Sequence, residues 1–420
     1  MRQKQRKYSV SAPGSPDQAV VGPIWPLILI LGTLSAYGPL TIDMYLPALP
    51  IIAKEFSTPY IQQTLALYFL GLSLGQLIYG PLSDRFGRKR PLLFGSALYI
   101  LASVGCAFSN SLGSLILFRI LQALGSSVGM VLTVSIVRDL FEPERSARIF
   151  SYLMLVMGFA PMLAPLLGGQ ILLVASWRII FLVLAAFGLL CFLLVLFGLR
   201  ESLLTERRRR VNIQNVFVTY TGILMDRRFL AYALPSSLMS AGFFTYLSAS
   251  SLVFIDVFSV SPQNFGWIFG LNAIGLVTVA QVNARLLDWF RSDAILKAAL
   301  IGVVIASVSL LGIVLAGLAT MQVTWLLLFF CIAGTGFIRP NTTAGAMANF
   351  ADRAGSTSAL LGALGSVTGT LAGMLLSYLH STSVLPMAAM IASSFILALV
   401  SLQLFKTTSN QASTDLKEVR

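Results

Sequence analysis

Twelve stretches of about 20 mostly apolar residues follow one another along the chain, separated by short segments rich in charged residues, proline or glycine. A stretch of about 20 apolar residues is long enough for an α-helix to cross about 30 Å of hydrocarbon. The pattern therefore predicts an all-α integral membrane protein with twelve transmembrane helices. The predicted spans cover residues 24–46, 60–82, 91–109, 112–137, 147–173, 178–199, 229–252, 263–285, 294–317, 321–346, 355–380 and 384–405, with ends placed to within several residues.

One long polar segment interrupts this series after the sixth span and holds four consecutive arginines, Arg207 to Arg210. It divides the chain into an N-terminal tail (1–22), a six-helix bundle (23–199), a linker (200–228), a second six-helix bundle (229–406) and a C-terminal tail (407–420). The middle of the linker, 211–225, predicts either a helix along the inner leaflet or a plain tether. Two six-helix halves indicate an internal duplication, an architecture in which two lobes rock around a central site.

The composition agrees with a membrane protein, because 56% of the residues are hydrophobic, only 11% are charged and the mean hydropathy is +0.83. The net charge of +13 would also fit a nucleic-acid-binding protein. The distribution of the charge argues against that class and for the excess of Lys and Arg that membrane proteins keep in cytoplasmic loops. We therefore expect membrane lipids, and no nucleic acid, as surroundings.

The basic residues also predict the orientation. If the N-terminus is cytoplasmic, every Lys and Arg lies in a cytoplasmic segment except Lys54 and Arg178, which lie outside, and Arg119 and Arg339, which lie within spans. We expect a multi-pass protein of the bacterial inner membrane with both termini in the cytoplasm. The three cysteines lie in apolar runs without metal-ligand spacing, so we expect no metal and no cofactor.

The loop between the second and third spans carries a glycine-rich, charged motif, Gly80-Pro-Leu-Ser-Asp84-Arg85-Phe-Gly87-Arg88-Lys-Arg. A merely positive cytoplasmic loop would need neither the glycines nor the acid. The segment resembles the loop motif of the major facilitator superfamily. That resemblance implies the superfamily's two-lobed fold and a role for Asp84 as a conformational latch against the other lobe, where the start of the eleventh span, near Ser356 and Thr357, would attract a carboxylate.

The fifth span contains closely spaced glycines and prolines, namely Gly158, Pro161, Pro165, Gly168 and Gly169. Two prolines bend a helix, and small residues let another helix approach closely. The alternative is a kinked span without functional direction. The segment resembles the antiporter motif of drug exporters, with Ala164 in place of a glycine, and this resemblance implies export.

Two charged residues lie inside spans. Arg119 and Gln122 in the fourth span resemble the superfamily's arginine element, which takes part in proton coupling, and Asp43 in the first span lies in a segment that resembles the Bcr/CflA subgroup of drug:proton antiporters. We hypothesise that Asp43 carries the proton and Arg119 is its partner, because burial disfavours a charged carboxylate and a nearby guanidinium favours it. The alternatives are that Asp43 caps the helix end and that Arg119 snorkels to the surface.

Further residues are candidates for lining a substrate cavity by their position, and Arg339 with Pro340 either lines that cavity or ends the tenth span early. We predict a proton-coupled efflux antiporter for drugs or other small molecules, of bicyclomycin or phenicol type, acting as a monomer and not as an enzyme. The alternative is a proton-coupled importer or a metabolite exporter of the same fold. The cavity candidates are Tyr37, Gln122, Phe243, Tyr246, Asn272 and Asn341.

Overall fold

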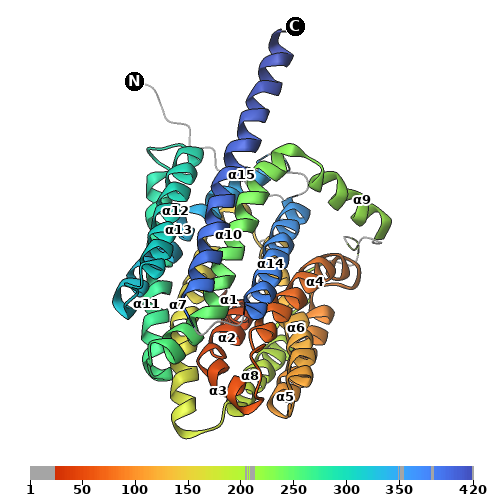
Figure 1. Cartoon of the computed structure of the whole chain (residues 1–420). Coiled ribbons are helices and arrows are strands. Elements are labelled where there is room, and N and C mark those ends of the chain that lie inside the picture. The colour runs from red at the N-terminus through yellow and green to blue at the C-terminus, as the bar shows by residue number, and fades with distance from the viewer. Residues whose placement is uncertain are drawn as a thin grey trace, which may run out of the picture.

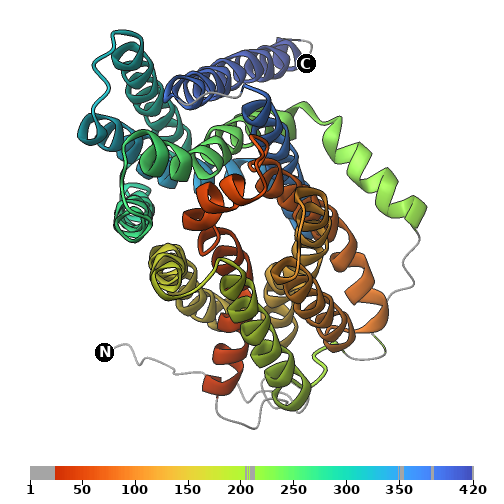
Figure 2. The same cartoon turned by 60° about the horizontal axis from the view of Figure 1, so that its bottom comes forward.

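The computed structural model describes residues 24–203, 206, 208, 213–348, 350, 354–379 and 383–418, and all regular structure within these ranges is helical. Twelve helical segments of this described part are long and apolar enough to cross a membrane. The predicted fold class and number of spans are therefore confirmed. The helices run side by side in two groups (Figures 1 and 2).

The first group, called here the N-terminal lobe, holds the elements before the linker. These are α1 (Ile24–Ser35), α2 (Tyr37–Asp43), η2 (Leu46–Ala48), α3 (Leu49–Glu55), α4 (Gln63–Phe86), α5 (Lys89–Ala107), α6 (Leu112–Leu140), α7 (Pro143–Val174), α8 (Arg178–Leu193) and η3 (Leu194–Gly198). The C-terminal lobe holds α10 (Arg227–Ser251), η5 (Leu252–Val257), α11 (Pro262–Leu286), α12 (Ser292–Leu315), α13 (Met321–Met347), α14 (Ala354–Tyr378) and α15 (Leu385–Glu418).

The first span differs from its predicted extent. The span predicted over 24–46 stops just before Pro47, and proline disfavours the continuation of a helix because it lacks an amide hydrogen. The chain instead continues as α2, η2 and α3 to Glu55, with each proline in the first turn of a new helical piece. Proline is tolerated at that position because its missing donor would have no helical partner. Asp43 thus lies inside a longer, segmented span rather than at its end.

The linker contains a helix, α9 (Ile213–Leu224), which lies outside both bundles and contacts α10 and α14 (Figures 1 and 2). Ile223 anchors it in a small apolar cluster with Phe229 of α10. The side of the molecule where α9 lies, α1 begins and α15 ends is called here the linker side, and the opposite side the distal side.

The lobes meet along two helix pairs, α4 with α14 and α7 with α11. On the distal side α3 also contacts η5, and η2 contacts α10 and α11. Within the N-terminal lobe, glycine lets helices approach closely, because a Cβ atom on Gly71 of α4 would lie 2.6 Å from the carbonyl oxygen of Ile120 in α6. These contacts place the middle of α2 and α6 deep inside the protein.

Candidate functional site

Arg119 of α6 is fully buried, yet it has no acidic partner among the described residues. Its Nη1 donates to the carbonyl oxygen of Thr41 at 3.2 Å and to Oε1 of Gln122 at 2.8 Å. The guanidinium lies 4.2 Å from the ring centre of Tyr68 and 4.6 Å from that of Tyr45. Cation–π contacts of this kind contribute about 0.5–2 kcal/mol each, but Nε and Nη2 still lack a partner. The site therefore holds an incompletely satisfied cation.

Asp43 ends α2 and is 5% exposed. In the described part of the chain it forms no hydrogen bond and no ion pair, so the expected pair between Asp43 and Arg119 is not formed in this conformation. Asp43 is close enough to the phenol groups of Tyr68 and Tyr246 to interact with both electrostatically. Because Tyr68 also contacts the Arg119 guanidinium, it stands beside both charged groups. The two groups are neighbours through Tyr68 and the α2 backbone rather than direct partners.

A network of polar groups inside the N-terminal lobe surrounds the arginine. Gln122 Nε2 donates to the Ser103 hydroxyl at 2.8 Å, and the Thr41 and Tyr99 hydroxyls are 2.7 Å apart. Tyr37 packs on Tyr99 with ring centres 4.5 Å apart. Tyr37 and Gln122, proposed from the sequence as cavity residues, are both fully buried in this lobe. Their placement fits support of Arg119 and α2 better than direct contact with a ligand.

The candidates of the C-terminal lobe fall into two places. Asn272 Nδ2 donates to the Tyr246 hydroxyl at 2.7 Å, and the side-chain oxygen Oδ1 of Asn272 is buried without a hydrogen-bond partner in the described part of the protein. Phe243, on the same helix as Tyr246, is partly buried within the core. Asn341 lies elsewhere, near the linker side, where its amide bonds Asn283 Oδ1 at 2.7 Å. Tyr246 and Asn272 thus form one polar pair facing Asp43, and Asn341 does not belong to it.

The predicted latch residues form a charged cluster on the linker side. Arg88 donates to Asp84 at 2.6 Å and to both carboxylate oxygens of Asp139, at 2.8 and 3.4 Å. Burial lowers the pKa of Arg88, but the carboxylates of Asp139 and Asp84 outweigh this effect and hold its pKa above the ordinary value. Among the described residues, Asp84 forms no hydrogen bond with the start of α14. Arg85 is exposed and lies over the Phe86 ring.

Two members of this cluster, Asp139 and Glu201, were not singled out from the sequence as site residues. Glu201 Oε1 accepts from the amide of Arg88 at 2.7 Å and Oε2 from the amide of Lys89 at 3.3 Å, so the linker acid caps α5. Gly87 has φ of +86° and leaves room for that carboxylate, whereas Gly80 faces open space. The sequence signal that could have identified them is their position, because Asp139 follows the fourth span and Glu201 follows the sixth.

Two glycines of the fifth span, Gly158 and Gly169, lie where α7 meets the other lobe. A Cβ atom on Gly169 would lie 2.8 Å from the Pro262 carbonyl oxygen of α11, and one on Gly158 would lie 3.2 Å from Val277. Gly168 faces the backbone of Met44, directly after Asp43. Pro161 and Pro165 sit inside α7, which continues through both. The glycines thus allow close packing between the lobes at Gly158 and Gly169, and close packing within the N-terminal lobe beside the candidate acid at Gly168.

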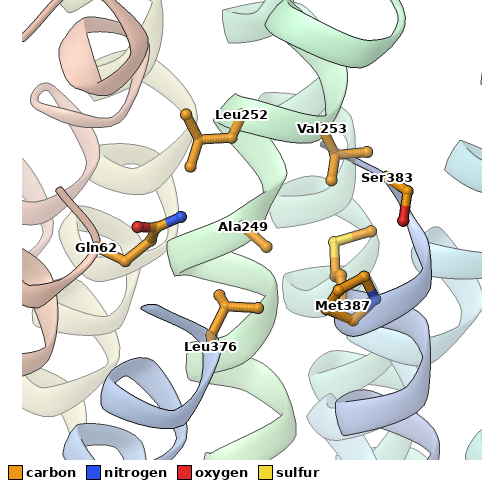
Figure 3. Close-up of a pocket in the computed structure, with 8 residues that line it drawn as sticks. Gln62, Ala249, Leu252, Val253, Leu376, Ser383 and Met387 are labelled. Atoms are coloured by element: carbon orange, nitrogen blue, oxygen red, sulfur yellow. The ribbon is translucent and has the colours of Figure 1, made fainter. Parts of the chain in front are cut away.

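The two lobes also contact each other on the distal side. Lys54 of α3 pairs with Asp256 of η5 at 3.3 Å, and the rings of Tyr60 and Tyr378 are in contact. A small pocket of about 30 Å³ lies here (Figure 3), lined from both lobes by Gln62, Ala249, Leu252, Val253, Leu376, Ser383, Pro386 and Met387. It holds none of the predicted site residues. Ligand pockets usually have several hundred cubic ångströms, so this pocket is far too small for a drug-sized molecule.

The chain is similar to the family model described as Major Facilitator Superfamily over residues 29–373. It is 37% identical to an uncharacterized MFS-type transporter, YdgK, of Bacillus subtilis, covering 86% of this chain and 91% of the relative. It is 29% identical to a bicyclomycin resistance protein homolog of Haemophilus influenzae, with the same two shares. It is 31% identical to a chloramphenicol resistance protein of Pseudomonas aeruginosa, covering 86% and 85%.

The fold is similar to that of the xylose transporter XylE from E. coli in a partially occluded inward-open conformation. The TM-score is 0.72 at 14% identity, covering 91% of this chain and 97% of XylE, and at this identity the likeness concerns the fold alone. The names of the relatives support the subgroup predicted from Asp43 and its neighbours. With a family model that matches most of the spans and a fold that agrees, this chain belongs to the Major Facilitator Superfamily of membrane transporters.

Proposed function

We propose that this protein is a proton-coupled exporter of drug-like small molecules that works by alternating access, with Asp43 as proton carrier and Arg119 as its partner. The observation that carries the proposal is a buried acid and a buried arginine in spans that lie side by side, neither of which forms an ion pair with any residue that the structure describes. Isolated ionisable groups inside a membrane protein are costly and mark functional sites.

The proton cycle follows from the two environments that Asp43 can have. A carboxylate without donors in an apolar interior is costly, so the present arrangement suits the protonated carboxyl group. A direct contact with the Arg119 guanidinium would favour the ionised form. If the two arrangements alternate as the lobes move, Asp43 takes up a proton in one state and gives it up in the other.

The neighbours of Asp43 connect it to both lobes. The η2 turn that follows it packs on α10 and α11, and Gly168 of α7 packs on Met44. A movement of the C-terminal lobe therefore acts directly on the segment that holds the acid. We assign the central substrate site to the region of Tyr246, Asn272 and Phe243, and a supporting role to Tyr37 and Gln122.

Export, rather than import, is supported by two observations. Relatives of this chain are named for resistance to bicyclomycin and chloramphenicol. The residues that resemble an antiporter motif lie at the contact between the lobes. By the distribution of basic residues, the linker side with both termini faces the cytoplasm of a bacterial inner membrane. The functional unit in this proposal is a monomer, because each chain holds both lobes and both charged groups.

The charged cluster on the linker side acts, in this proposal, as a latch for the other conformation. In the present one Asp84 pairs with Arg88 of its own loop and is half exposed. When the linker side closes, Asp84 comes within reach of the N-terminal turn of α14, whose free amide groups attract a carboxylate.

The test is an efflux panel in a bacterial host that lacks its own pumps. Cells that express the protein are expected to expel phenicols or bicyclomycin, and a protonophore is expected to stop this. Asp43→Asn removes the proton carrier and should abolish efflux at unchanged membrane expression. Asp288→Asn, an equal change at an exposed loop position, should leave efflux intact. Undiminished efflux by Asp43→Asn, or with the proton gradient collapsed, would contradict the proposal.

A further inference from the structure

Arg339 lies within the spanning helix α13. The sequence left open whether Arg339 and Pro340 line a cavity or end this span early. α13 runs unbroken from Met321 to Met347 with Pro340 inside it, so the helix does not end at this point. Arg339 is eight residues from the end of α13, about 12 Å from the linker side at 1.5 Å per residue. It therefore lies well inside the span.

The face of α13 that carries Arg339 points into the protein. Thr335, Thr342 and Ala346 lie three to seven residues away on the same face, and they are 3%, 0% and 1% exposed. Phe330, which is 55% exposed, lies nine residues before Arg339 and hence on the opposite face. Arg339 is nevertheless an exposed residue. Its accessible surface therefore faces space between the helices, and not lipid.

Arg339 has no acidic partner in the described part of the chain. Thr342 and Thr343 donate to its backbone carbonyl oxygen only. Two acids at the linker-side ends of spans have partners of their own, since Asp139 binds Arg88 and Asp293 accepts from Tyr232. An unpaired arginine inside a span is unfavourable by about 2.5–3.5 kcal/mol on insertion scales, so its presence requires a use.

The charged residues inside the described spans carry a net positive charge. Among the described residues, Asp43, Arg119 and Arg339 are the charged groups at least seven residues from either end of their spans. An ionised Asp43 balances the positive charge of one of the two arginines. A protonated Asp43 balances the charge of neither arginine. Arg339 is the one nearest to the linker side, whereas Asp43 and Arg119 lie in the distal half.

We propose that Arg339 selects the compounds that enter from the linker side, binding those with a carboxylate or another strongly accepting anionic oxygen and disfavouring cations. This inference rests on the proposed transport function and adds a substrate class to it. A guanidinium binds a carboxylate through two parallel hydrogen bonds. In a partly enclosed site of low effective dielectric constant it attracts anions and repels cations much more strongly than in water.

The test measures binding, without a proton gradient, to the full-length protein in lipid nanodiscs. Three dansyl probes of matched size carry a neutral amide, a carboxylate or a trimethylammonium group. The wild type should bind the carboxylate probe most tightly and the trimethylammonium probe most weakly, and added salt should weaken carboxylate binding alone. Tighter binding of the trimethylammonium probe by the wild type would overturn the proposal without any variant.

The variants locate the effect. Arg339→Gln should reduce the carboxylate-to-ammonium affinity ratio by about tenfold, Arg339→Glu should invert the preference, and Arg339→Lys should keep it. Arg285→Gln removes the same charge from the exposed end of α11 and should not change the ratio. An unchanged ratio in folded Arg339→Gln or Arg339→Glu would refute the assignment. Because binding is measured without a gradient, failure of proton-driven export in cells would be a separate result.

Discussion

The cluster around Arg88 allows a prediction that separates a structural role from a conformational one. Arg88 has two acidic partners with different environments. Its own side chain is 8% exposed, that of Asp139 is 18% exposed and that of Asp84 is 50% exposed. We therefore expect Asp139→Asn to destabilise the folded protein and Asp84→Asn to leave its stability nearly unchanged, although Asp84 is the residue of the family motif.

The magnitudes follow from burial. Removing one partner of a buried ion pair costs about 3–5 kcal/mol, because the remaining charge is uncompensated. Asp84 stays beside Arg88 in the Asp139→Asn variant, so we expect a loss of about 2–3 kcal/mol in the free energy of unfolding. An ion pair with a half-exposed partner contributes about 0–1 kcal/mol, which bounds the effect of Asp84→Asn. For a chain of this length, the Tm should fall by roughly 2–3 °C in Asp139→Asn and by at most about 1 °C in Asp84→Asn.

The assay is thermal unfolding of purified protein in one detergent, combined with efflux in cells. Asp139→Asn should lower the Tm, and the double variant Arg88→Gln with Asp139→Asn should recover part of the loss because no buried charge is then left alone. Asp84→Asn should keep the Tm but reduce efflux, since it removes the carboxylate that would reach α14. Asp288→Asn, in the corresponding exposed loop of the other lobe, serves as the neutral control. Equal destabilisation by Asp84→Asn and Asp139→Asn would refute the ranking by burial.

Three further predictions concern the contacts between the lobes and the cap on α5. Gly169→Leu should abolish efflux without loss of membrane expression, because a side chain at this position would clash with α11. Gly302 on α12 faces open space, so Gly302→Leu should be neutral in the same efflux assay. Lys54→Glu should make a cysteine introduced in the distal half more accessible to a thiol reagent. The increase should be small, because the ion pair with Asp256 is exposed and contributes under about 1 kcal/mol. Adding Asp256→Lys should restore the original accessibility. Glu201→Ala should lower stability by about 0.5–2 kcal/mol, measured as a fall in Tm, because two amides at the start of α5 lose their acceptor.

The twelve spans could be predicted from the sequence because hydrocarbon imposes one rule on every span, a run of apolar residues of fixed length. The exception is the first span, where Pro47 and Pro50 indicated an end. There the chain restarts a helix at each proline, and the outcome depends on packing of η2 against the other lobe, which no local pattern encodes. Local rules therefore predicted the number of helices but not the course of the helix that carries Asp43.

The candidate site was predictable only in part, for a related reason. A charge in an apolar run is visible in the sequence, and this identified Asp43 and Arg119. The loop around Arg88 was identified by its motif of glycines and charged residues. Whether two charges pair depends on contacts between residues far apart in the chain, such as Arg88 with Asp139, 51 residues later. The same holds for Asp43 and Arg119, which form no ion pair with each other in this structure.

Neither Arg119 nor Asp43 has a charged partner within the described ranges, and the positions of the two residues explain both observations. Arg119 already bonds the carbonyl oxygen of Thr41, two residues before Asp43, and both charged groups lie beside Tyr68. We therefore expect a rearrangement at the end of α2 to be the movement that brings the carboxylate to the guanidinium nitrogens Nε and Nη2. That end of α2 is followed by η2, which packs on the other lobe, so the lobes cannot move relative to each other without changing its environment. Under the proposed function this connection is what links the protonation of one carboxyl group to the opening and closing of the transporter.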